Sequence, residues 1–259
     1  MAVFYALESK FDPVAATKWM RAYWPFSIYL SLLYVIFIYA GTRFMRNRTP
    51  YKLTRALFLW NIALAVFSTI GAAVCFHSLA AVVYEIGVLR SICWMNVIDV
   101  PHLSIWAFIF SLSKAAELFD TFFIVMRKSQ LIFLHWYHHT TVLTFAWYFY
   151  AYPAALGQWM TPINYGIHSL MYTYYALRAA GVRVPLCGSQ MVTILQLMQM
   201  FIGIVYNAYG AYVVSVGGDC MLPWGTFVFA MTIYGTYAVL FIHYYVQRYI
   251  WKKPKEKAS

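Results

Sequence analysis

The chain has 259 residues, of which 63% are hydrophobic and only 10% are charged, and its mean hydropathy is +0.63. Soluble domains are roughly a quarter charged, so this composition excludes an ordinary soluble protein and indicates an integral membrane protein. The net charge of +11 raises the question of nucleic acid. The basic residues are spread over short loops, however, which favours anionic lipid headgroups or a phosphate-rich soluble substrate as partners instead.

Seven apolar runs are long enough to cross a bilayer, since a crossing helix needs roughly 20 mostly apolar residues. In chain order they are 26–42, 57–77, 104–126, 131–150, 155–178, 189–212 and 224–248. The gaps are too short for another domain, which predicts one all-α membrane domain over 26–248 between tails at 1–25 and 249–259. The N-terminal tail has no features of a removable signal peptide, so the first span is expected to direct insertion.

The distribution of Lys and Arg predicts the orientation, because these residues concentrate in cytoplasmic loops. They gather after the first, third and fifth spans and in the C-terminal tail: Arg43, Arg46, Arg48, Lys52, Arg55, Arg127, Lys128, Arg178, Arg183, Arg248, Lys252, Lys253, Lys255 and Lys257. The N-terminus is therefore predicted outside the cytosol and the C-terminus inside it. Cys93 and Cys220 then share the oxidising side, so they are the pair expected to form a disulfide, with two free buried thiols as the alternative.

Four of the predicted spans carry a polar stripe, which is costly in a membrane and by default functional. At 100° per residue each stripe occupies one face of its helix. The members are Lys114, Glu117 and Asp120; His135, His138 and His139; Asn164, His168, Tyr172 and Tyr175; and Gln196, Gln199 and Asn207. At a rise of about 1.5 Å per residue, the key groups lie about 9 to 15 Å inside the cytosolic end. This common depth predicts a polar chamber in the cytosolic half of the bilayer.

Each stripe also has a purely structural interpretation. Lys114 with its two carboxylates can be a neutralised charge cluster, and the amides of the sixth span can join helices by hydrogen bonds. Three imidazoles on one face are harder to satisfy in this way. For His77, His102 and His243, which lie away from the stripes or near a helix end, a structural role is the simpler interpretation.

Three imidazoles in the pattern HxxHH suggest either a metal site or nucleophilic catalysis. A di-iron centre with eight or more histidine ligands is disfavoured, because the chain has only seven histidines. A single metal held by His135, His139 and His168 stays open, although no metal is our preferred expectation. A buried imidazole stays neutral, and neutral imidazole is both a nucleophile and a general base. That chemistry suits transfer of an acyl group from a thioester, with amide or hydroxyl donors steadying the oxyanion.

Four sequence motifs, in order, resemble those of the ELO/ELOVL family of very-long-chain fatty acid elongases. They are SKAAELFDT at 113–121, LHWYHH at 134–139, NYGIHSLMYTYY at 164–175 and ILQLMQM at 194–200. The HWYHH form is similar to the branch that acts on long saturated and monounsaturated acyl chains. The resemblance implies an endoplasmic reticulum enzyme that condenses a long-chain acyl-CoA with malonyl-CoA to 3-oxoacyl-CoA, CO2 and CoA. It also implies that spans two to seven form an inverted-repeat barrel around a narrow acyl tunnel, with the first span peripheral.

The resemblance also implies residue roles. His138 would carry the acyl group as an acyl-imidazole, with His168 beside it and His135 and His139 tuning it. The remaining implied site residues are Lys114, Glu117 and Asp120 as organising groups, Asn164, Tyr172, Tyr175, Gln196 and Gln199 as the lining, and Arg127, Lys128, Arg178, Arg183 and Arg248 at a mouth that suits the phosphates of CoA.

No cofactor is expected beyond the CoA thioesters, which are substrates. The expected partners are the lipid bilayer and the reductases and dehydratase of the elongation cycle, and a homo-oligomer is compatible with the sequence. The tail Lys255-Glu256-Lys257-Ala258-Ser259 matches the KxKxx form of a retrieval signal. A receptor or a transporter with seven spans is the competing class. A transporter needs polar access from both faces, and the non-cytosolic half of this chain has few polar residues.

Overall fold

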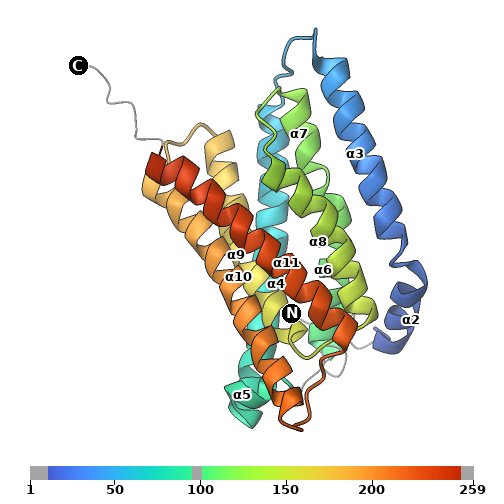
Figure 1. The fold of residues 1–259 in the computed structure, drawn as a ribbon. Helices are drawn as coiled ribbons and strands as arrows, with labels where there is room; N and C mark the ends of the chain where they lie inside the picture. Colours follow the sequence, from blue (N-terminus) through green and yellow to red (C-terminus); the bar gives the residue numbers. More distant parts are fainter. Residues whose placement is uncertain (1–10, 95–100, 252–259) are drawn as a thin grey trace.

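The computed structural model describes residues 11–94 and 101–251, apart from the side chains of Pro101 and His102. All regular structure in these residues is helical (Figure 1). The helices are α2 Pro13–Tyr23, α3 Phe26–Met45, α4 Thr54–Ile86, α5 Val88–Ser91, α6 Pro101–Glu117, α7 Asp120–Met126, α8 Phe133–Ala151, α9 Gly157–Ala179, α10 Leu186–Ser215, α11 Trp224–Tyr245 and the π-helix η2 Val246–Trp251. The retrieval sequence predicted at 255–259 lies outside the described residues.

Four helices are long and apolar enough to cross a membrane, which agrees with the composition. They are α3, α4, α10 and the continuous stretch of α11 and η2. The other three predicted ranges are also helical, and they are the ones with the buried charged and imidazole side chains. The helical structure and the membrane character are therefore confirmed.

The structure differs from the prediction for the third span, 104–126, which is not one continuous helix. α6 ends at Glu117 and α7 begins at Asp120. Around this break the backbone donates to residues three positions earlier, as from Phe119 N to Ala116 O at 2.9 Å and from Phe122 N to Phe119 O at 3.0 Å. Neither proline nor glycine marks the position. Lys114 and Glu117 before the break bind α9, whereas Asp120 and Thr121 after it bind α3, α4, α8 and α9.

The region predicted as an N-terminal tail contains α2. Asp12 caps this helix through its carboxylate, which accepts hydrogen bonds from Val14 N at 2.9 Å and Ala15 N at 3.0 Å. Pro13 at the first helical position has a backbone suited to a helix start. The helix packs against α8 and α6, and Arg21 Nε donates to Ala151 O at 2.9 Å. Asp followed by Pro was the sequence signal that could have predicted it.

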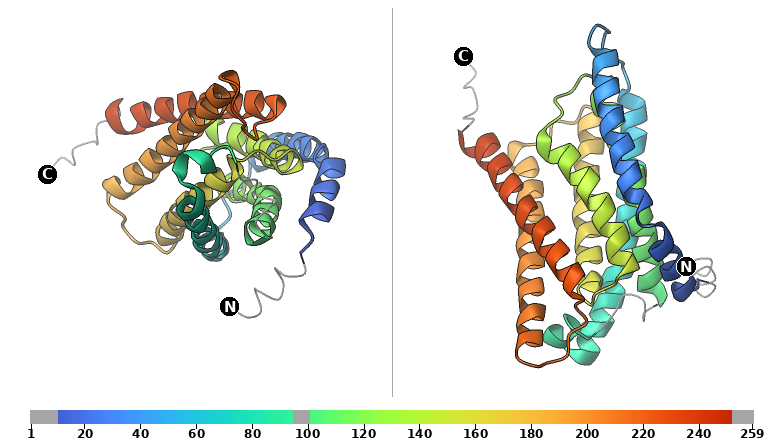
Figure 2. Two further views of the ribbon diagram at one scale, coloured as in Figure 1. Left: turned by 90° about the horizontal axis from the view of Figure 1, so that it is seen from below. Right: turned by 45° about the vertical axis from the view of Figure 1, so that its right-hand side comes forward.

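The long helices run side by side, with α2 and α3 at one edge of the bundle and α10 and α11 at the opposite edge (Figures 1 and 2). α4 packs along α9, and α10 packs along α11. The loops 46–53, 127–132 and 180–185 lie together at one end (Figure 1), which we call the basic end. At the other end a disulfide joins Cys93 to Cys220 across 127 positions of the sequence. We call this the disulfide end.

α8 lies between two aromatic cores. Its residues Leu143 and Trp147 pack into a cluster with Trp106 and Tyr165, whereas Phe145 belongs to a cluster with Tyr234, Tyr237 and Phe241 of α11. α8, the helix that carries three histidines, is thus packed against other helices on both sides.

Gly71 is required by the close approach of α4 and α9, and we predict that its replacement destabilises the protein. A Cβ at Gly71 would lie 2.7 Å from two ring atoms of Tyr165. That ring cannot move away, because it is 1% exposed, packs against Phe67 and Phe110, and donates its hydroxyl to Trp106 O at 3.0 Å. Gly71→Ala should therefore lower the free energy of unfolding by about 1–3 kcal/mol, measured by thermal unfolding in detergent.

The matched control is Gly235→Ala in α11, where a Cβ meets no atom within 4 Å. Alanine there favours the helix, so the melting temperature should stay the same or rise. Equal melting of the Gly71 variant and the wild type would show that the α4–α9 contact is not as tight as described.

Candidate functional site

The polar stripes meet in one cavity that reaches the basic end. We call it the polar chamber, and its volume is about 250 Å³. Its lining includes Glu117, Asp120, Ile132, His135, His138, His139, Asn164, His168, Tyr175, Gln196, Gln199, Tyr244, Arg248 and Tyr249. The predicted convergence of spans three to six is therefore present in the structure, and α11 with η2 also contributes to the wall.

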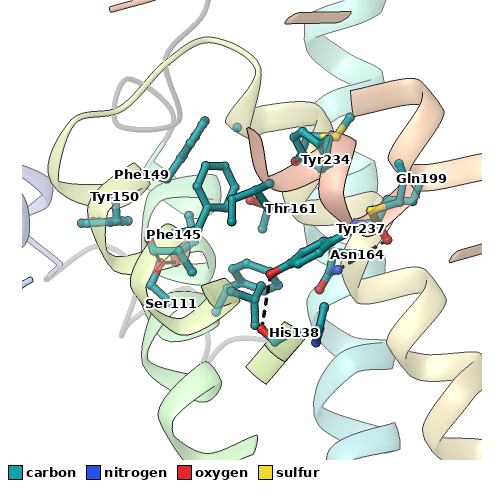
Figure 3. Close-up of a pocket in the computed structure, with 18 of the residues that line it drawn as sticks. Ser111, His138, Phe145, Phe149, Tyr150, Thr161, Asn164, Gln199, Tyr234 and Tyr237 are labelled. Carbon is teal, nitrogen blue, oxygen red and sulfur yellow. Dashed lines mark hydrogen bonds between the residues drawn. The ribbon is translucent and has the colours of Figure 1, made fainter. Parts of the chain in front are cut away.

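A second cavity, drawn in Figure 3, shares part of its lining with the polar chamber. It extends along α8 toward the disulfide end, as far as Phe149 and Tyr150. We call it the apolar chamber; its volume is about 80 Å³. Its lining includes Ala107, Phe110, Ser111, Val142, Phe145, Phe149, Tyr150, Pro153, Gly157, Thr161, Ile233, Tyr234 and Tyr237. Four residues, His138, Asn164, Gln199 and Met200, line both cavities and so define the junction between them.

His138 is fixed at this junction by its neighbours. Its ring lies 4.9 Å from the ring of Tyr237, whose hydroxyl is 3.3 Å from the His138 carbonyl oxygen (Figure 3). His135 and His139 are one helical turn apart on α8, and the centres of their rings lie 4.3 Å from each other. His139 Nδ1 is buried and has no hydrogen-bond partner among the described residues. One ring nitrogen of the three histidines of α8 is therefore unsatisfied within the described part of the chain.

A buried chain of hydrogen bonds orients the amides at the junction. Lys114 Nζ donates to Glu117 Oε1 at 2.8 Å and to Asn164 Oδ1 at 3.2 Å. Asn164 Nδ2 then donates to Gln199 Oε1 at 3.4 Å. With its oxygen accepting from Asn164, Gln199 has its NH2 group as the part of the side chain that can donate at the junction. Lys114 itself is 1% exposed and lies behind the chamber wall.

Glu117 also faces the second buried histidine. Its Oε1 lies 3.8 Å from His168 Nδ1, and it accepts a hydrogen bond from Ser113 Oγ at 3.3 Å. His168 lines the polar chamber together with His138. The two histidines that sequence analysis put at the centre of the site therefore share one cavity.

Asp120 belongs to a different network from that of Lys114 and Glu117, which divides the predicted three-charge cluster. Its carboxylate accepts from Trp60 Nε1 at 2.5 Å and from Tyr172 OH at 2.8 Å. These bonds join α7 to α4 and α9. Tyr172 is 1% exposed and is not among the described lining residues, so it supports the site from behind, whereas Tyr175 lines the chamber.

The outer residues predicted to bind substrate fall into two groups: those that line the polar chamber and those that do not. Gln196 lines the polar chamber and donates to Met171 Sδ at 3.3 Å, and Arg248 lines it at the basic end. Lys128 Nζ instead donates to the carbonyl oxygens of Arg46 and Arg48, both at 3.0 Å, and so ties two loops together. Arg127, Arg178 and Arg183 are on or beside the basic-end loops and are not among the described lining residues.

The described residues contain no group of three His, Cys, Asp or Glu side chains arranged to hold a metal ion. His77 and His243 are both exposed and line neither chamber, and the side chain of His102 lies outside the described residues. Sequence analysis missed several residues that contact the site, namely Tyr34, Trp60, Thr121 and Tyr237. Aromatic and hydroxyl side chains are frequent throughout this chain, so no pattern set these four apart.

The buried pair of Lys114 and Glu117 generates a prediction about stability. Lys114→Met leaves Glu117 buried without its cation, which should lower the free energy of unfolding by about 3–5 kcal/mol. Lys114→Met combined with Glu117→Leu removes both charges and should recover most of that loss. The measurement is thermal unfolding of the two single variants and the double variant. Losses that simply add in the double variant would contradict the coupling of this pair.

Known proteins resemble this chain over nearly its whole length. The model of the ELO: GNS1/SUR4 family matches residues 19–257. The chain is 40% identical to very long chain fatty acid elongase 6 of Gallus gallus, over 98% of this chain and 95% of the relative, and 39% identical to the Homo sapiens protein of that name, over 97% and 94%. It is 37% identical to very long chain fatty acid elongase 3 of Homo sapiens, over 92% and 87%. Since both the family model and these relatives cover nearly the whole chain, the protein belongs to the ELO: GNS1/SUR4 family.

Proposed function

We propose that this protein is the condensing enzyme of fatty acid elongation, a 3-oxoacyl-CoA synthase that joins a long-chain acyl-CoA to malonyl-CoA. The relatives named above are very long chain fatty acid elongases. The observation that carries the proposal is the position of His138 at the junction of a polar and an apolar chamber. A thioester at this junction would have its CoA part in the polar chamber and its hydrocarbon tail in the apolar one.

The proposed first step is attack of a His138 ring nitrogen on the thioester carbon. The carbon–sulfur bond breaks, CoA leaves as the thiol with the proton released from the imidazole, and an acyl-imidazole forms. The oxygen of the thioester gains negative charge during this step. The free NH2 group of Gln199 at the same junction is positioned to donate to it.

The second step is decarboxylation of malonyl-CoA. Loss of CO2 leaves an enolate whose carbon attacks the acyl-imidazole, the carbon–nitrogen bond breaks, and 3-oxoacyl-CoA is released. The imidazole leaves with a proton, so the overall reaction consumes one proton. His168, close to Glu117 and in the same chamber, is the proposed proton carrier.

Substrate selection and CoA binding follow from the two ends of this path. The HWYHH motif supports long saturated and monounsaturated acyl chains as substrates. Arg248 lines the polar chamber at the basic end and is the favoured contact for CoA phosphates. The other predicted basic residues would attract CoA only through the positive electrostatic field of the basic end, since none is among the described lining residues. They are Arg127, Lys128, Arg178 and Arg183.

We also propose seven membrane spans, with the predicted second to seventh forming an inverted-repeat barrel and α3 at its edge. The helical structure of all seven predicted ranges supports this count. The basic end would face the cytosol, and the disulfide end would face the lumen of the endoplasmic reticulum. A disulfide at that end is compatible with an oxidising compartment. The reductases and dehydratase of the elongation cycle are the proposed partners.

Intact-mass measurement of the purified protein tests the covalent step. With acyl-CoA alone, the mass should rise by one acyl group, and malonyl-CoA should then discharge the adduct. His138→Ala should give no adduct, whereas His77→Ala, which changes an exposed histidine outside both chambers, should behave as the wild type. Condensation without any adduct would contradict the acyl-imidazole, and a desaturated or hydroxylated product of unchanged length would overturn the proposed activity.

The length of the apolar chamber should limit the product. Phe149 lies eleven residues after His138 on α8, about 16 Å away along the helix, and both line this chamber (Figure 3). We predict that Phe149→Ala opens the far end and lengthens the products by one or more two-carbon additions. The control is Phe133→Ala, which removes an exposed aromatic ring from the same helix. The chain lengths of the products are measured by chromatography. An unchanged length distribution in Phe149→Ala would show that Phe149 does not limit the product length.

A further inference from the structure

The edge helix α3 reaches the catalytic histidines through two hydroxyl groups. Tyr34 of α3 is buried, and its hydroxyl lies 2.6 Å from Thr121 Oγ1 of α7. Thr121 is fully buried, and the same oxygen lies 2.9 Å from His135 Nε2 of α8. Three helices therefore meet in one chain of hydrogen bonds that ends on a histidine of the polar chamber.

The hydrogens available to this chain allow three arrangements. A threonine hydroxyl has one hydrogen and two lone pairs, so Thr121 can donate to one neighbour and accept from the other, or accept from both. In the first arrangement Tyr34 donates to Thr121 and Thr121 donates to His135 Nε2. In the second arrangement His135 Nε2 carries the hydrogen and donates to Thr121, which donates to Tyr34. In the third arrangement Tyr34 and His135 Nε2 both donate to Thr121, whose own hydrogen goes to neither of them.

The first arrangement satisfies both hydroxyl groups and His135 Nε2. In the second, the hydroxyl hydrogen of Tyr34 needs another acceptor, and the described residues offer it none besides Thr121. In the third, the hydroxyl hydrogen of Thr121 is in the same position, since its described partners are only Tyr34 and His135. A buried donor without an acceptor is costly, because it has lost its water and gained nothing. We propose that Tyr34 and Thr121 are positioning residues that hold His135 in the tautomer with its hydrogen on Nδ1.

This tautomer gives His135 a defined function in the polar chamber. Nε2 is occupied by Thr121, so Nδ1 is the nitrogen left for a bound molecule, and it can only donate. The adjacent His139 has a buried Nδ1 without a partner among the described residues. With the proposed condensing function, on which this step rests, the His135 Nδ1–H is a donor for oxygens that gain charge during the reaction.

Neighbouring side chains at the start of α7 bind different helices. Asp120 and Thr121 are neighbours in sequence, yet Asp120 binds Trp60 and Tyr172 while Thr121 binds Tyr34 and His135. The start of α7 is thus tied to α4 and α9 on one side and to α3 and α8 on the other. A change at Thr121 therefore acts on the histidines without touching the Asp120 network.

Nuclear magnetic resonance of full-length protein with nitrogen-15-labelled histidine tests the tautomer without reference to activity. His135→Gln identifies the resonances of His135. We expect the hydrogen on Nδ1 in the wild type and in Thr121→Ser, which keeps the hydroxyl. Thr121→Val, which has nearly the same shape but no hydroxyl, should lose this preference. A hydrogen on Nε2 in the wild type would overturn the proposal.

Kinetics test the consequence for the reaction. Thr121→Val should lower kcat by about tenfold to a hundredfold with little change in KM for acyl-CoA, and Thr121→Ser should restore it. Tyr34→Phe should lower kcat in the same direction. The controls are Thr232→Val, whose hydroxyl binds only its own helix, and Tyr39→Phe, an exposed tyrosine on α3.

The two proposals fail in different ways. If the wild type makes no 3-oxoacyl product, the proposed function fails, and the tautomer measurement still decides the hydrogen-bond chain. If the wild type is active but Thr121→Val and Tyr34→Phe keep full kcat, positioning by this chain is wrong. If Thr121→Val does not fold, Tyr34→Phe and the wild-type tautomer still decide the outcome.

Discussion

A polar group inside a membrane helix has no water to bind, so it must find a partner on another helix, and this requirement organises the site. Lys114 illustrates it, because its ammonium group is fully enclosed and binds Glu117 on its own helix and Asn164 on α9. Asn164 in turn binds Gln199 on α10. One buried cation therefore fixes the relative positions of three helices and the orientation of two amides at the junction.

The same requirement explains why the cavity has two characters. Toward the basic end the wall includes imidazoles, carboxylates and amides beside apolar and tyrosine side chains. Toward the disulfide end the wall is mostly aromatic and aliphatic, and its described lining holds no ionisable side chain beyond His138 and tyrosine hydroxyls. A molecule with a charged head and a hydrocarbon tail has only one favourable direction in such a cavity. The change from the polar wall to the apolar wall of the cavity occurs at His138.

The sequence was sufficient for the helices and the polar faces, because both depend on local periodicity. It did not reveal the break at 118–119, since neither proline nor glycine marks that position. It also grouped Asp120 with Lys114 from their shared face, although Asp120 binds Trp60 and Tyr172 and has no hydrogen bond to Lys114 among the described residues. For the basic residues predicted at the mouth, positive charge indicates which end a loop occupies, but not whether its side chain enters the cavity. Lys128, for example, binds the backbone of a neighbouring loop.

α3 is both a peripheral helix and a helix connected to the polar chamber. α3 lies at the edge of the bundle and exposes much of its apolar surface, as a helix in contact with lipid should. Its one buried tyrosine nevertheless ends a hydrogen-bond chain that reaches His135. A hydrogen bond is directional, whereas hydrocarbon packing is not, so a single hydroxyl can couple the position of an edge helix to the orientation of the His135 ring. For this reason α3 is better described as the outermost part of the site than as a separate anchor.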